Sequence, residues 1–167
     1  MTDQHADAAA TGRATWGIDS NRGWSHFECA RVADVPRTGH ISCRVQLWGE
    51  FWDRNVPTAA ADLVPDFRID LPQVLMAEES LRALHDHFDH WLTSYEHFDC
   101  ELVPDDAGGQ SLVVSVGKRE DMIYTRDKPA ITFTYSAGFS MRGEWSFVID
   151  QSCVWLCRDA LKEFLHR

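Results

Sequence analysis

The sequence predicts a single α+β domain, in which antiparallel β-sheet meanders carry two helices packed on the sheet. Three observations predict this class. Apolar and polar residues alternate over several short segments, which is the pattern of half-buried strands. Two longer segments repeat their apolar residues with the period of a helix. The segments follow one another as strands, helix, strands, helix, an order that favours antiparallel meanders over a parallel βαβ series.

The length of the chain indicates one domain with a tail. Its 167 residues fall within the usual range for a single domain. Residues 1–13 are small, polar and without periodicity, so we expect a disordered tail there. The domain is then expected to occupy residues 14–167.

The first half contains three segments that are predicted to be strands. Residues 26–34 form the first, and a turn at residues 36–39 separates it from residues 41–52, whose alternation is the clearest in the chain. The inner face of this second strand is expected to carry Ile41, Cys43, Val45, Leu47 and Phe51. Its outer face is expected to carry Ser42, Arg44, Gln46, Trp48, Glu50 and Trp52. Residues 66–71 form a third, short strand that Pro72 is expected to end.

Residues 78–95 are predicted to form the first helix. Placing residues at intervals of about 100° gathers the large apolar side chains into one stripe. Glu78 and Glu79 suit the positive end of the helix dipole. The predicted core stripe consists of Leu81, Leu84, Phe88, Trp91, Leu92 and Tyr95.

The second half repeats the same sequence of elements. Strands are predicted at residues 101–103, 111–118, 131–135 and 145–149. A second helix is predicted at residues 152–165, with Asp150 or Ser152 as its N-cap. Its buried face is expected to carry Cys153, Cys157, Ala160, Leu161 and Phe164.

The charge balance excludes two classes of partner. Lys and Arg number 16 against 26 Asp and Glu, which gives a formal net charge of −10. Nucleic-acid binding depends on basic patches, and the longest basic cluster is Lys118-Arg119, so nucleic acid is not expected to be a partner. An anionic membrane surface is disfavoured for the same reason. A basic protein partner would be attracted, and its encounter rate would rise.

Cysteine usage predicts a cytoplasmic protein. The chain has five cysteines, an odd number without CxxC spacing, which argues against a disulfide framework. No basic start is followed by an apolar segment, so no secretory signal is expected. No run of about 18 apolar residues is present either, which argues against a membrane span. Reduced thiols in the cytosol are the simplest interpretation.

The histidine-rich run at residues 84–90 is the first candidate for chemistry. A metal site needs three or four ligands that converge on one point. On a helix, His87 and His90 lie about 200° and about 140° away from His85, so the three rings diverge. Only the pairs His85–Asp89 and Asp86–His90 share a face. The run therefore predicts a solvated helix face, and no metal ligand or cofactor is predicted.

No motif for covalent catalysis is present. Cys153 and Cys157 lie one turn apart on an apolar face, where burial raises the pKa of a thiol and lowers its reactivity. The chain has no GxSxG, no GxGxxG and no P-loop. We therefore predict no catalytic residue and no enzymatic activity.

Exposed aromatic residues are the more informative feature, because the chain has seven tryptophans. Trp91 and Trp145 fall on predicted core faces. Trp48 and Trp52 fall on the outer face of their strand, beside Arg44, and Trp155 falls on the polar side of the second helix. Trp together with Arg is typical of binding hot spots. The alternative interpretations are that a second layer covers these rings, or that Arg stacks on an isolated surface ring.

The stretch from Leu71 to Leu165 resembles a known kind of protein. A helix beginning Glu79-Ser80-Leu81-Arg82 is followed by strands, and a late Gly143-Glu144-Trp145-Ser146-Phe147 strand runs into a short C-terminal helix. This order resembles bacterial immunity proteins of the WapI-like kind and related small uncharacterised bacterial families. The resemblance implies a protein that neutralises a cognate toxin by binding it in the cytosol. It transfers no functional residue.

The sequence therefore predicts an immunity-like protein that binds and occludes a basic toxin domain. The first candidate surface is the outward strand face with Arg44, Trp48, Glu50 and Trp52. Trp155 and an acidic stretch are further candidates. The acidic stretch consists of Asp99, Glu101, Asp105 and Asp106. Two alternatives stay open: a small metal-dependent enzyme that uses the histidine-rich helix, and a structural or adaptor protein that self-associates through its Trp-bearing strand.

Overall fold

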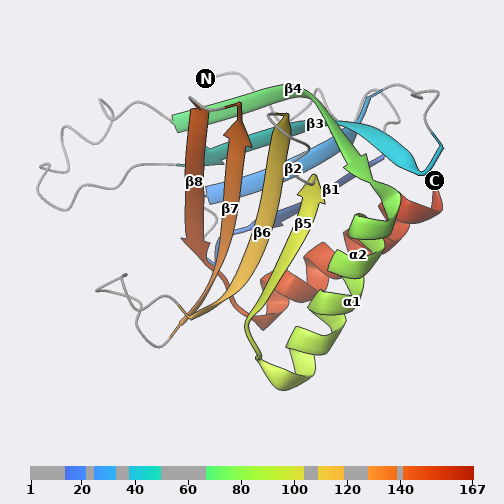
Figure 1. The fold of residues 1–167 in the computed structure, drawn as a ribbon. Helices are drawn as coiled ribbons and strands as arrows, with labels where there is room; N and C mark the ends of the chain where they lie inside the picture. The colour runs from blue at the N-terminus through green and yellow to red at the C-terminus, as the bar shows by residue number, and fades with distance from the viewer. Residues whose placement is uncertain are drawn as a thin grey trace, which may run out of the picture.

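The chain folds into two antiparallel sheets and two helices, as a computed structural model shows (Figure 1). The structure describes residues 14–21, 25–32, 38–49, 67–103, 109–118, 128–138 and 141–167. The predicted α+β class, with meanders and two packed helices, is confirmed. The predicted tail at residues 1–13 lies outside the described residues.

The first sheet is a four-stranded meander with the order β1-β2-β3-β4. Of the predicted inward residues of its third strand, Ile41, Cys43, Val45 and Leu47 are buried, and Phe51 lies outside the described residues. Ser42, which was predicted for the outer face, is buried as well. The sequence pattern did not predict β1, which is short but buries Trp16 and Ile18. The strands are β1 (Thr15–Asp19), β2 (Ser25–Arg31), β3 (His40–Gly49) and β4 (Phe67–Ala77).

The expectation that Pro72 ends the strand before the first helix is wrong. β4 continues through Pro72 to Ala77. Cys43 pairs with Val74 and Val45 pairs with Leu71, so a β-bulge lies around Pro72. β4 is an edge strand. A proline has no backbone N–H to donate, but at a bulge of an edge strand no carbonyl of the neighbouring strand needs that donor. The strand therefore survives the residue that was expected to stop it.

The second sheet repeats the meander with the order β5-β6-β7-β8. Leu112, Val114 and Val116 point inward from one strand, and Ile131, Phe133 and Tyr135 point inward from the next, as their alternation predicted. The strands are β5 (Phe98–Val103), β6 (Gln110–Lys118), β7 (Pro129–Ala137) and β8 (Met141–Val148).

The two helices, α1 (Glu78–Ser94) and α2 (Gln151–His166), begin and end close to their predicted bounds. Asp150 is the N-cap of α2, since its carboxylate accepts a hydrogen bond of 3.1 Å from the amide of Cys153. Among the described residues, no helix is long and apolar enough to cross a membrane.

Tyr95 is the exception to the predicted core stripe of α1. The helix ends at Ser94, and Tyr95 adopts a left-handed conformation (φ 57°) in which its amide bonds to the carbonyl of Trp91. This change of direction turns the ring away from the core, and Tyr95 is 55% exposed. Leu92 is only partly buried, and the other large side chains of the stripe, Leu81, Leu84, Phe88 and Trp91, are buried as predicted.

The inner faces of the two sheets meet in one core. Phe27 of β2 stacks on Phe133 of β7 with ring centroids 4.1 Å apart. Figure 1 shows the two sheets crossing at a large angle, with α1 and α2 together along one side of the pair. Each helix follows one sheet in sequence but contacts the first strand of the other: α1 contacts β5, and α2 contacts β1. The helices therefore join the two halves and complete the core on that side.

We expect Phe133→Ala to lower the free energy of unfolding by about 3–5 kcal/mol, the usual cost of deleting a buried phenyl ring. The ring is 1% exposed and holds the two sheets in contact, so its loss leaves a cavity between them. Urea denaturation would measure the change. Met141→Ala on an exposed position should change the free energy by less than about 0.5 kcal/mol. Equal effects of the two substitutions would contradict this account of the core.

Candidate functional site

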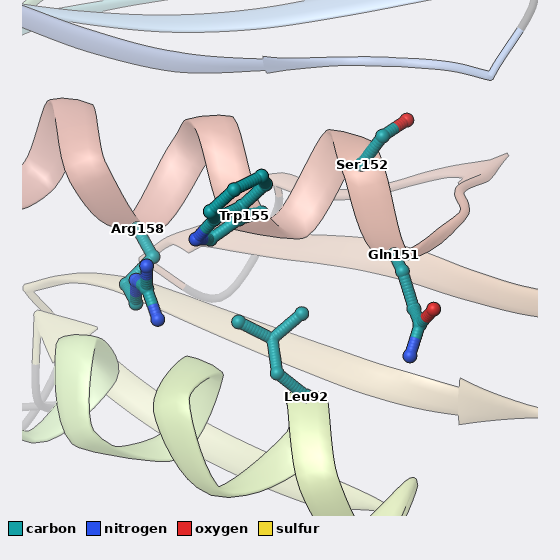
Figure 2. Close-up of a pocket in the computed structure, with 5 residues that line it drawn as sticks. All are labelled: Leu92, Gln151, Ser152, Trp155 and Arg158. Carbon is teal, nitrogen blue, oxygen red and sulfur yellow. The ribbon is translucent and has the colours of Figure 1, made fainter.

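A shallow, open groove lies between the two helices. It has a volume of about 450 Å³, and Figure 2 shows Leu92 of α1 opposite Trp155 and Arg158 of α2. Successive turns of α2 supply most of the lining, because its positions 151, 155 and 158 recur with the helical period on the side facing α1. We call this hollow the helix groove; its lining residues are Leu92, Gln151, Ser152, Trp155 and Arg158.

Hydrogen bonds between the helices hold the helix groove at two points. Arg158 donates from Nη1 to Oδ1 of Asp89 on α1, at 2.7 Å, and from Nη2 to Asp159, at 2.8 Å. Gln151 donates from Nε2 to the hydroxyl oxygen of Tyr95. These contacts fix α1 against α2 on both sides of Leu92. The lining of the helix groove is therefore already arranged before any partner arrives.

Three of the large hydrophobic side chains that are exposed in the described part of the chain belong to the helices or directly follow them, and one of these, Trp155, lines the helix groove. Tyr95 is 55%, Trp155 is 56% and Leu156 is 70% exposed. Trp155 was predicted from the helical pattern to lie on the polar side of α2, and it does. Leu156 was not singled out, because one apolar residue on a solvated face is ordinary. Leu156 is not among the residues that line the helix groove.

The predicted strand face is polar and largely paired with itself. Arg44 donates to both carboxylate oxygens of Asp70, from Nε at 2.9 Å to Oδ1 and from Nη2 to Oδ2. Gln46 donates to the same carboxylate at 3.1 Å. Trp48 is half-buried, and its ring lies 5.2 Å from the imidazole of His26. Trp48 therefore offers less free apolar surface than Trp155. Glu50 and Trp52, which were predicted for this surface, lie outside the described residues.

His26 is a residue of this face that the sequence pattern did not mark. Its Nδ1 lies 2.5 Å from Asp19 and its Nε2 lies 3.9 Å from Glu28. Burial is the largest single influence and lowers the pKa, but hydrogen bonds and charges from Glu28 and Asp19 outweigh it and raise the pKa of His26 above 6.5. Finding this cluster needed the pairing of Asp19 with His26 and of His26 with Trp48. The pairing of Asp19 with His26 could not be predicted from the sequence, because no strand was predicted at residues 15–19.

The acidic candidates lie on the second sheet. Asp99 and Glu101 are both exposed and alternate on the outer face of β5. A hydrogen bond from Ser115, and then the contact with His97, hold the pKa of Asp99 below its ordinary value, so the carboxylate is charged at neutral pH. Asp105 and Asp106 lie outside the described residues. The predicted site residues therefore fall on three separate surfaces: the outer face of each sheet and the pair of helices.

The histidines of α1 have separate contacts. His85 Nδ1 lies 3.3 Å from Asp86, and His90 Nε2 lies 3.2 Å from Glu96. The ring of His87 stacks on Phe98 with centroids 4.9 Å apart. Asp89, which shares a helix face with His85, accepts a hydrogen bond from Arg158 across the helices. Among the described residues, no group of three or more His, Cys, Asp or Glu side chains is placed to hold a metal ion.

The cysteines behave as small apolar residues of the core. Cys157 is fully buried and Cys153 is partly buried, close to what their spacing on the helix predicted. Burial raises the pKa of both thiols, and it raises that of Cys100 to about 11. Few thiolates are present near neutral pH under these conditions, so these side chains are poor nucleophiles.

Comparison with models of known protein families, with curated proteins and with solved structures found no match to this chain. The resemblance to WapI-like immunity proteins therefore stays a prediction from the order of elements.

We expect the stabilising effect of His26 to be larger in acid than in base. Its pKa is raised in the folded state, so its contribution is complete below about pH 6.5 and is lost as the pH rises through the folded value. His26→Asn should lower the free energy of unfolding more at pH 5.5 than at pH 8.5, by up to about 1 kcal/mol. Urea titrations at the two pH values would measure this difference.

The same titrations in an Asp19→Asn background provide the control for His26. Removing the nearer carboxylate should shrink the pH-dependent part of the His26→Asn effect, since the two groups are in contact. A pH dependence that is unchanged by Asp19→Asn would rule out this carboxylate as its source.

Proposed function

We propose that this chain is an immunity-like protein that binds a cognate bacterial toxin and inhibits it by occlusion. The observation that carries the proposal is the exposure of Tyr95, Trp155 and Leu156 on the paired helices, beside a preformed groove. Contiguous exposed apolar surface with a polar surround is typical of protein interaction sites. Tryptophan and tyrosine are enriched among the residues that contribute most to such interfaces.

The charge of the chain supports a basic partner. The net charge of −10 attracts a basic domain over distance and accelerates encounter. Toxins that act on nucleic acids need basic surfaces to bind their substrate. An acidic inhibitor that covers such a surface would block the substrate without any catalytic group of its own.

The proposal also draws on the resemblance to WapI-like immunity proteins, which was inferred from the order of elements in the sequence. α1, the strands of the second sheet and the short C-terminal α2 are the segments from which that resemblance was inferred. Two other functions were considered from the sequence. The metal-dependent enzyme lacks support because the histidines of α1 contact different neighbours. Self-association through the Trp-bearing strand is weakened because Trp48 packs against His26.

The proposal predicts that the product of the adjacent gene contains a toxin domain that this chain neutralises. Co-expression should restore growth of cells that produce the toxin domain, and the two proteins should co-purify in a stable complex. An immunity protein from an unrelated toxin system serves as the negative control. Absence of both rescue and complex formation would contradict the proposed function, whichever surface is involved.

A further inference from the structure

The two halves of the chain provide an internal comparison of their helices. Each half consists of a four-stranded meander followed by one helix, and each helix packs against the first strand of the other half. The buried positions of the two helices have identical spacing. They are Leu81, Leu84, Phe88 and Trp91 in α1, and Val154, Cys157, Leu161 and Phe164 in α2. The two helices therefore occupy equivalent positions in the fold, and their exposed faces can be compared residue by residue.

The comparison shows that the fold does not require Trp155 or Leu156. Trp155 follows the first buried residue of α2, and the corresponding residue of α1 is Arg82. Arg82 is exposed and donates to Glu78, one turn earlier, at 2.6 Å, as is usual on a solvated helix face. Leu156 corresponds to Ala83. The same two positions are thus occupied by a charged and a small residue on α1, and by two large apolar residues on α2.

We propose, on the basis of the inhibitory function above, that the helix groove at Trp155 is the docking site for a basic amphipathic helix of the partner. Leu92 and Trp155 present facing apolar surfaces in the helix groove, and Leu156, the next residue of α2, is also exposed. A volume of about 450 Å³ lies within the range of pockets that bind ligands. Placing the apolar stripe of one helix into a hydrophobic groove is a common mode of recognition.

Charge identifies which kind of helix fits. Arg158 is shared between Asp89 and Asp159, and both carboxylates remain more than half exposed. Glu163 adds another exposed carboxylate on the next turn of α2, against one further cation there, Lys162. These groups leave an excess of one carboxylate, and lysine or arginine side chains beside the apolar stripe would face the exposed oxygens of Asp89 and Asp159. A second copy of this chain would bring its own net charge of −10 and be repelled.

The test uses a synthetic peptide of about 18 residues, with Leu at positions i, i+3, i+4 and i+7 and Lys elsewhere. Fluorescence anisotropy of the labelled peptide measures its binding to the full chain. Trp155→Gln combined with Leu156→Ala, which leaves the net charge unchanged, should weaken binding at least about tenfold. A peptide with Glu in place of every Lys should also bind at least about tenfold more weakly.

Met141→Gln is the matched control, because Met141 is 59% exposed but lies on β8 of the second sheet. It should leave the affinity for the Lys peptide within about twofold. If the Lys peptide binds equally to the unchanged chain, to the variant at Trp155 and Leu156 and to Met141→Gln, its binding depends only on net charge and the proposal is overturned. Absence of binding to the unchanged chain would also overturn it. A dimer in light scattering that the Trp155 and Leu156 substitutions abolish would assign the helix groove to a second copy instead.

The result also separates this inference from the proposed function. If the variant at Trp155 and Leu156 still binds and neutralises the toxin domain, the inhibitor remains but the helix groove is not its site. Substitutions at Trp48, or at Asp99 and Glu101, would then locate the interface. If the Lys peptide binds in the helix groove but no toxin is neutralised, the docking site stands and the immunity function fails.

Discussion

The face-to-face packing of the two sheets is the constraint on which the remaining structure depends. Phe27 and Phe133 stack across the interface, and the inward residues of β3, β6 and β7 close around them. Each sheet therefore buries one face in the core and exposes the other, which carries mostly polar residues. Two sheets in contact still need a cover along the open side of the core. That cover is the pair α1 and α2, and it explains why each helix packs against the opposite half of the chain.

This arrangement decides where function can reside. The outer face of the first sheet is occupied by contacts among its own residues, with Arg44 bonded to Asp70 and the Trp48 ring packed against His26. The outer face of β5 carries charge without a large apolar anchor. The helices combine a fixed groove, exposed aromatic surface and carboxylates. Of the described surfaces, only the helix pair therefore unites the features that a protein partner requires.

Local patterns in the sequence predicted most of the fold and little of the site. The inward residues of β3 and the stripe of α1 follow from periods of two and of 3.6 residues, which depend only on neighbours along the chain. The part of β4 beyond Leu71 was not predicted, because a proline ends most strands. Pro72 is tolerated here because β4 is an edge strand with a bulge in its pairing with β3. The contacts of His26 with Asp19 and Trp48 were not predicted either, because they depend on the pairing of three strands. The helix groove joins Leu92 to Trp155, and no local pattern links residues so far apart.

The difference between the two helices bears on why Trp155 is where it is. Packing explains the buried positions, and these are alike in spacing on α1 and α2. Packing does not explain the exposed positions. At the position of α1 that corresponds to Trp155, the fold accommodates Arg82, which forms a salt bridge with Glu78. A large ring left in water gains little folding stability and raises the risk of unspecific association. Its presence at one of two equivalent positions is therefore better explained by a contact that the isolated chain does not make.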